Sequence, residues 1–126
     1  MDITMNAEPF RYSIERLGTH IEVRVTGNAT LDEFVALIDA MAFETRKHRD
    51  RRALVNLLQV VNELKFTDHF QIGEEAARKL QNLDRLASIV PPDRITRTSE
   101  KVAQHKGMEL RVFTDHAEAL GWLIAV

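Results

Sequence analysis

The sequence contains no cysteine among its 126 residues, which excludes disulfide bonds, thiol nucleophiles and cysteine-ligated zinc sites. It also has no apolar run near the roughly eighteen residues that a membrane-spanning helix needs, so no integral membrane segment is expected. The first nine residues carry two acidic side chains and no long apolar stretch, which argues against a signal peptide. We therefore expect a cytoplasmic protein.

Neither sign of charge dominates the chain. Seventeen lysines and arginines face nineteen aspartates and glutamates, a formal net charge of -2. This balance argues against a strongly basic binder of nucleic acids or membrane surfaces. The hydrophobic fraction of 44% is typical of a globular protein, and no linker or repeat divides the chain. We expect a single domain over residues 1–126, with residues 1–10 flexible.

Hydrophobic periodicity predicts an α/β fold. Alternating apolar and polar residues predict strands at Tyr12–Arg16 and Ile21–Thr26, and Gly18 between them indicates an antiparallel hairpin. Nearly continuous apolar runs are typical of buried parallel strands and occur at 53–58, 85–90 and 110–113. Helical spacing predicts four helices, at about 30–48, 68–80, 93–106 and from 115 onward. We therefore expect a mixed, mostly parallel five-stranded sheet with an N-terminal β-hairpin and about four helices.

Short local signals mark several helix ends. Thr30 and Glu33 have the spacing of a capping box, and Asp115 with Glu118 forms an acidic variant of it. Thr67 is expected to be the N-cap of the second helix, and Gly107 to stop the third. Gly73 is expected to let its helix approach a neighbour closely.

Four segments in this order resemble the STAS fold, and most closely its SpoIIAA-like branch. They are VTGNATLDEFVALIDAM, RALVNLL, DRLASIV and ELRVFTDHAEALGWL. In that branch a strand ending in an aromatic residue is followed by Asp and a terminal helix ending near Trp-Leu; here these are Phe113, Asp115, Trp122 and Leu123. The resemblance implies a STAS-like domain, and the branch consists mostly of small proteins of undefined function.

One feature of the anti-sigma-factor antagonists within the STAS fold is missing. Their phosphorylated serine lies in an Asp-Ser-Ser-Gly-like segment at the start of the helix after the third strand. The nearest segment here runs from Thr67 to Gly73, and His69 and Phe70 occupy the serine positions. The usual phosphoserine switch is therefore not expected.

The segment after the third predicted strand is unusually apolar for a connection at the edge of a sheet. We assign the candidate ligand or partner contacts to six of its residues: Val60, Val61, Leu64, Phe66, His69 and Phe70. These residues could form a lid over an apolar ligand or a patch that docks another subunit. The alternative is a small side core in which Phe66 packs onto Phe70 across the helix start.

Two other groups of residues suggest chemistry less strongly. Asp68–His69, Asp93–Arg94 and Asp115–His116 all follow parallel strands and should reach one rim, where a hydrolase or metal site could form. Each Asp, however, begins a predicted helix and is explained as a cap. The basic run 46–52, with Arg46, Lys47, His48, Arg49, Arg51 and Arg52, suits a helix C-terminus and a solvated turn.

We therefore favour a non-enzymatic STAS-like regulatory or protein-interaction module that binds a protein partner or forms a homodimer. The second hypothesis is a domain that binds a small apolar ligand or lipid beneath the 60–70 segment. The third is a small hydrolase that uses His69 or His116. We expect no metal, no cofactor and no nucleic-acid partner, since no catalytic, metal-binding or phosphate-binding motif is visible.

Overall fold

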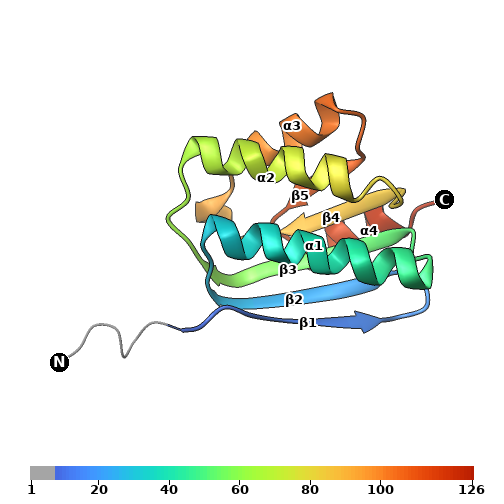
Figure 1. Cartoon of the computed structure of the whole chain (residues 1–126). Coiled ribbons are helices and arrows are strands. Elements are labelled where there is room, and N and C mark those ends of the chain that lie inside the picture. Colours follow the sequence, from blue (N-terminus) through green and yellow to red (C-terminus); the bar gives the residue numbers. More distant parts are fainter. Residues whose placement is uncertain (1–7) are drawn as a thin grey trace.

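The computed structural model describes residues 8–126 and contains five strands, four α-helices and one short 3-10 helix (Figure 1). Residues 1–7, which belong to the segment expected to be flexible, lie outside the described part. The strands are β1 (Arg11–Arg16), β2 (Ile21–Asn28), β3 (Arg52–Val61), β4 (Arg85–Ile89) and β5 (Leu110–Phe113). The helices are α1 (Leu31–His48), α2 (Phe66–Lys79), α3 (Thr98–His105), α4 (His116–Ile124) and the 3-10 helix η2 (Pro92–Arg94).

The strands form one sheet in the order β1-β2-β3-β4-β5. β1 pairs antiparallel with β2, and the other three pairings are parallel. The predicted fold class is therefore confirmed, including the N-terminal hairpin and the mostly parallel sheet. The parallel strands all end at the same edge of the sheet, where ligands usually bind in open α/β folds.

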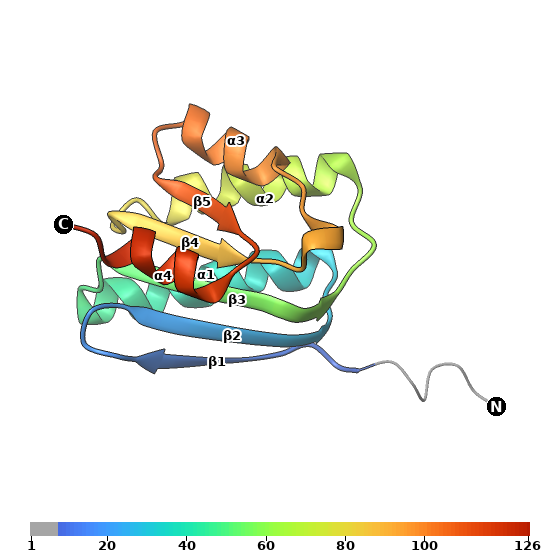
Figure 2. The ribbon, with the colours of Figure 1, turned by 180° about the vertical axis from the view of Figure 1, so that it is seen from behind.

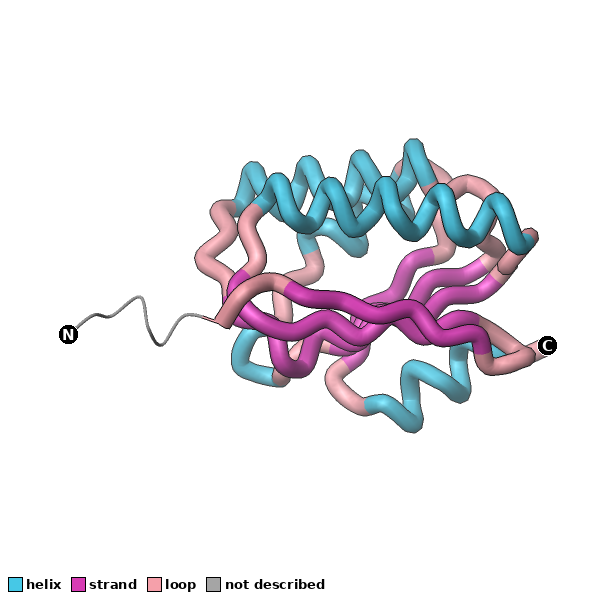
Figure 3. The backbone as a smooth tube through the Cα atoms, turned by 60° about the horizontal axis from the view of Figure 1, so that its bottom comes forward, coloured by secondary structure: helices cyan, strands magenta, loops and turns pink. Residues whose placement is uncertain are grey.

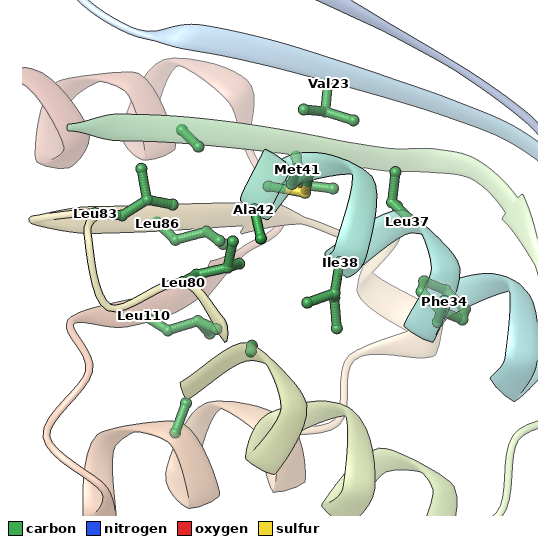
Figure 4. Packing of buried hydrophobic residues seen from close by; sticks show 14 of the residues in the cluster. Val23, Phe34, Leu37, Ile38, Met41, Ala42, Leu80, Leu83, Leu86 and Leu110 are labelled. Atoms are coloured by element: carbon green, nitrogen blue, oxygen red, sulfur yellow. The ribbon is translucent and has the colours of Figure 1, made fainter. Parts of the chain in front are cut away.

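The helices cover the two faces of the sheet unequally. α1, α2 and α3 pack on one face, whereas α4 alone packs on the other, against β3, β4 and β5 (Figures 2 and 3). The larger core lies under α1 and α2 and includes Leu37, Ile38, Met41 and Leu80 (Figure 4). A smaller core under α4 contains Leu54, Ala87, Ile89, Ala119 and Leu123. The sheet is thus apolar on both faces only where helices cover it.

α1 begins where the sequence predicts. The Thr30 hydroxyl accepts a hydrogen bond from the Glu33 N–H at 3.2 Å, and the Glu33 carboxylate accepts one from the Thr30 N–H at 3.0 Å. These two reciprocal bonds satisfy backbone donors that the first turn leaves free. α4 begins in a related way, because the Asp115 carboxylate accepts from the Glu118 N–H at 2.9 Å.

Two predicted helix starts are wrong. Thr67 is not the N-cap of α2, which begins one residue earlier at Phe66; there the Asp68 carboxylate accepts a hydrogen bond from the Lys65 N–H at 2.9 Å. The third helix does not run from 93: η2 forms directly after Pro91, and α3 begins only at Thr98. The backbone leaves the helical region at Ile95, which is extended with φ −70° and ψ 128°.

Gly73 is the contact point between α2 and α3. A Cβ atom at this position would lie 2.6 Å from the Ser99 carbonyl oxygen and 2.9 Å from the Val102 Cβ. Only glycine permits this spacing without a shift of one helix, so the predicted close approach is observed. The packing of α3 on α2 in turn places Ser99 beside the carboxyl ends of β3 and β4.

Candidate functional site

The apolar segment 60–70 contributes side chains to two different places. Val60 is 4% exposed, and together with Leu64 and His69 it lines a cavity beneath the segment. Val61, Phe66 and Phe70 remain exposed to solvent. Val60 and Val61 separate because neighbouring residues of a strand point to opposite faces. The six predicted contact residues therefore divide equally between an inner and an outer set.

The cavity lies at the carboxyl ends of the parallel strands, between the sheet and the first turns of the covering helices. Its volume is about 80 Å³. Its lining is mostly apolar and comes from α1, β3, α2, β4, α3 and β5 and from the loops after β3 and β4: Phe34, Leu57, Val60, Asn62, Leu64, His69, Ile72, Ser88, Val90, Pro91, Arg94, Thr96, Ser99 and Val112. An apolar cavity with a few polar groups is the usual form of a small-molecule site.

The polar groups of the cavity carry positive or neutral charge. Arg94 is an exposed residue that also lines the cavity, and no carboxylate side chain belongs to the lining. Burial lowers the pKa of His69 below its ordinary value, although the neighbouring Asp68 carboxylate partly opposes this shift. His69 is therefore neutral at physiological pH, and Arg94 supplies the one permanent charge of the lining.

Ser88 and Ser99 belong to the cavity and are not among the predicted contacts. Ser88 lies in the middle of β4, on the same face as Leu86, and Ser99 lies in the first turn of α3. Strand alternation from Leu86 would have placed Ser88 on the helix-covered face. No sequence signal places Ser99 there, because its position depends on the contact between α3 and Gly73.

Within the outer set, the two phenylalanines form an aromatic patch, defined here as Phe66 and Phe70. The rings of Phe66 and Phe70 have centroids 6.5 Å apart and are tilted by 46°. Their side chains are 68% and 41% exposed, so the two rings touch without forming a buried core. The contact of Phe66 with Phe70 that the side-core alternative predicted is therefore present, but the two rings are not buried as a core.

The two Asp–His pairs lie on opposite faces of the sheet. His69 lines the cavity on the face that α1 and α2 cover, whereas His116 begins α4 on the other face. There its Nε2 lies 3.6 Å from a carboxylate oxygen of Glu22. Asp68 and Asp115 both accept backbone hydrogen bonds at helix starts, as caps do. Both pairs follow the carboxyl ends of parallel strands, as expected, but they lie on opposite faces of the sheet and do not form one site.

A polar cluster surrounds Glu22 on the α4 side of β2. Glu22 is only 6% exposed; its carboxylate pairs with Arg24 at 3.3 Å and lies 3.6 Å from Nε2 of His116. Burial lowers the pKa of His20; the Glu22 charge partly opposes this effect and His116 reinforces it. Within residues 8–126, no three His, Asp or Glu side chains gather as the ligands of a metal ion would.

The basic run 46–52 makes structural contacts. The Arg46 guanidinium donates to the Lys79 carbonyl oxygen at 2.5 Å, and Arg51 pairs with Asp84 at 2.6 Å. Lys47 lies over the ring of Phe43, and Arg49 ends α1 with a positive φ of 58°. These contacts agree with the interpretation of the run as the C-terminal end of a helix and the turn that follows it.

The fold and the cavity define an α/β module with a mostly parallel sheet and a small site at its carboxyl edge. A family model described as SpoIIAA-like matches residues 20–124. The chain belongs to the SpoIIAA-like family, and the resemblance in the sequence is confirmed.

A solved structure supports the same fold. The chain is similar to an uncharacterised protein of the DUF3478 family with a SpoIIAA-like fold from Shewanella loihica, with a TM-score of 0.57 and 17% sequence identity. The match covers 90% of this chain and 93% of that chain. No curated protein matches the sequence. Within residues 8–126, no helix has both the length and the apolar character to cross a membrane.

Proposed function

We propose that this protein is a non-enzymatic STAS-like regulatory module that docks a second copy of itself, or another protein, through the aromatic patch. The observation that carries this proposal is the exposure of the neighbouring rings of Phe66 and Phe70 at the start of α2. Clustered exposed apolar side chains usually mark contact surfaces, and aromatic residues supply much of the binding energy at such surfaces.

The remaining surface offers little support for catalysis. The two candidate histidines lie on opposite faces of the sheet, so they do not form one acid–base pair. The aspartates beside them are engaged with backbone N–H groups at helix starts. A binding role is therefore favoured over the small hydrolase. We also place the protein in the cytoplasm, since its composition lacks cysteine and long apolar runs.

Sedimentation velocity across a wide range of concentrations tests the docking proposal. We expect a monomer–dimer equilibrium in the natural protein and at least tenfold weaker association in the double variant Phe66→Ser/Phe70→Ser, as expected for central aromatic contacts. Phe43→Ser is the matched control, because the Phe43 side chain is 66% exposed on a distant part of α1. Equal association of all three proteins would contradict the patch. A natural protein that stays monomeric would contradict self-docking.

The cavity favours a second candidate function, the binding of a small apolar ligand. Its lining is mainly aliphatic and aromatic, and the inner residues of segment 60–70 cover it. Native mass spectrometry of the freshly purified protein would detect a retained small molecule as an added mass. Loss of that mass in Leu64→Asp would place the molecule in the cavity, and an unchanged mass would place it elsewhere.

A further inference from the structure

The charge of the cavity lining identifies the class of ligand more closely than its apolar character does. Arg94 is the only permanently charged side chain in the lining, and no Asp or Glu side chain opposes it there. Within residues 8–126 Arg94 forms no ion pair, whereas its neighbour Arg97 is paired with Glu100 at 2.8 Å. A planar guanidinium free of protein carboxylates is suited to bind a carboxylate through two parallel hydrogen bonds.

The apolar part of the lining sets the character of the rest of the ligand. Phe34, Leu64 and Ile72 come from different elements and face the same space. A hydrocarbon chain placed among them would be removed from contact with water. This burial of apolar surface is the main source of affinity in such sites. Arg94 is exposed and is the last residue of η2, in the connection after β4, so it stands at the opening rather than in the interior.

The volume limits the size of the ligand. A cavity of about 80 Å³ holds about five to eight water-sized groups, because each needs about 10–15 Å³ of such volume. This range corresponds to a short-chain carboxylic acid and is too small for the full length of a membrane lipid.

We propose that the cavity binds a small amphipathic carboxylate of about five to eight non-hydrogen atoms, with its chain among Phe34, Leu64 and Ile72 and its carboxylate on Arg94. This inference rests on the second candidate function and adds the charge and the length of the ligand. It is independent of docking through the aromatic patch, since Phe66 and Phe70 do not line the cavity.

Titration of the ¹⁵N-labelled protein with hexanoate tests the proposal. We expect saturable shifts at the amides of lining residues, including Ser88 and Ser99. 1-Hexanol has the same chain without the charge and should bind at least tenfold more weakly. Acetate has the charge without the chain. At the concentration at which hexanoate saturates the site, acetate alone should shift none of these amide signals. Decanoate, which exceeds the volume, should bind more weakly than hexanoate.

Variants separate the charge from the cavity itself. Arg94→Gln should weaken hexanoate at least tenfold and leave 1-hexanol unchanged, whereas Lys101→Gln, an exposed cation of α3 outside the lining, should change neither. Ser99→Leu should weaken both compounds because a larger side chain would fill the space. The ligand series still decides the question if that variant fails to fold.

The outcomes distinguish the two levels of the proposal. Equal affinities for hexanoate and 1-hexanol would overturn the proposed recognition of the carboxylate by Arg94. The cavity would then be a site for apolar ligands. Tighter binding of decanoate would overturn the size limit. If none of the compounds produced saturable shifts, the cavity would not be a ligand site. The sedimentation results on Phe66 and Phe70 would be unaffected by that outcome.

Discussion

Gly73→Ala tests how closely α2 and α3 must pack. In the middle of an exposed helix, replacing glycine by alanine stabilises a protein by about 1 kcal/mol, because the backbone loses less freedom on folding. At Gly73 the new Cβ would lie 2.6 Å from the Ser99 oxygen and 3.0 Å from the Ser99 Cα. Both are backbone atoms, so neither can rotate away. Overpacking of this kind costs about 1–3 kcal/mol, and we expect a net loss of up to about 2 kcal/mol.

Gly121→Ala provides the matched control. Gly121 lies inside α4, and a Cβ there would meet no atom within 4 Å. This variant should therefore gain the helix-propensity term alone, about 0.5–1 kcal/mol. The difference between the two variants cancels that shared term and isolates the cost of the contact, which we expect to be about 1–3 kcal/mol.

Urea denaturation of the two variants measures this difference directly. Thermal unfolding should agree, since a change of 1 kcal/mol moves the Tm of a domain this size by about 4 °C. Equal stabilisation by the two substitutions would refute the contact between Gly73 and Ser99. Because Ile72 and Ser99 both line the cavity, Gly73→Ala should also weaken hexanoate binding, whereas Gly121→Ala should not.

Three further substitutions test the stability of the elements around the site. Thr30→Ala removes the cap of α1 and should lower the free energy of unfolding in urea by about 1 kcal/mol; a change near zero would contradict the capping box. Glu100→Ala leaves the Val112 N–H without its acceptor and should cost about 1–3 kcal/mol, whereas Glu100→Gln keeps an acceptor and should cost less. His20 has a lowered pKa, so below about pH 6.5 the unfolded chain binds a proton that the folded chain does not. Unfolding in urea should therefore become easier as the pH falls through this range, and less so in His20→Gln; an equal pH dependence of the two proteins would contradict this assignment.

The elements that the sequence predicts correctly are those with local causes. Thr30 and Glu33 are three residues apart, and Asp115 and Glu118 likewise, so the starts of α1 and α4 depend on contacts within one turn. Strand alternation in Ile21–Asn28 reflects burial of one face and needs no knowledge of the partner strand. The predicted N-cap of α2 is wrong because Asp68, and not Thr67, accepts the backbone hydrogen bond at the helix start, from the Lys65 N–H.

The cavity could be predicted only in part, because its members meet through long-range packing. Val60, Leu64 and His69 follow from one apolar segment of sequence. Ser99 joins them because α3 packs on Gly73, and Arg94 because η2 turns the chain back after β4. These contacts join residues more than twenty positions apart in the chain, and no periodicity of one segment records them. The division of segment 60–70 has a local cause at Val60 and Val61, where strand alternation separates the two side chains.

This division decides how the two proposed activities relate to each other. A lid that also docked a partner through the same side chains would have to bury them twice, so one event would exclude the other. Here the inner residues Leu64 and His69 and the outer residues Phe66 and Phe70 are different side chains of one short segment. Both surfaces can therefore be occupied together, and substitutions in one set leave the other set in place. Any effect of a cavity ligand on docking must then pass through the backbone at the start of α2, and docking must change ligand affinity by the same factor.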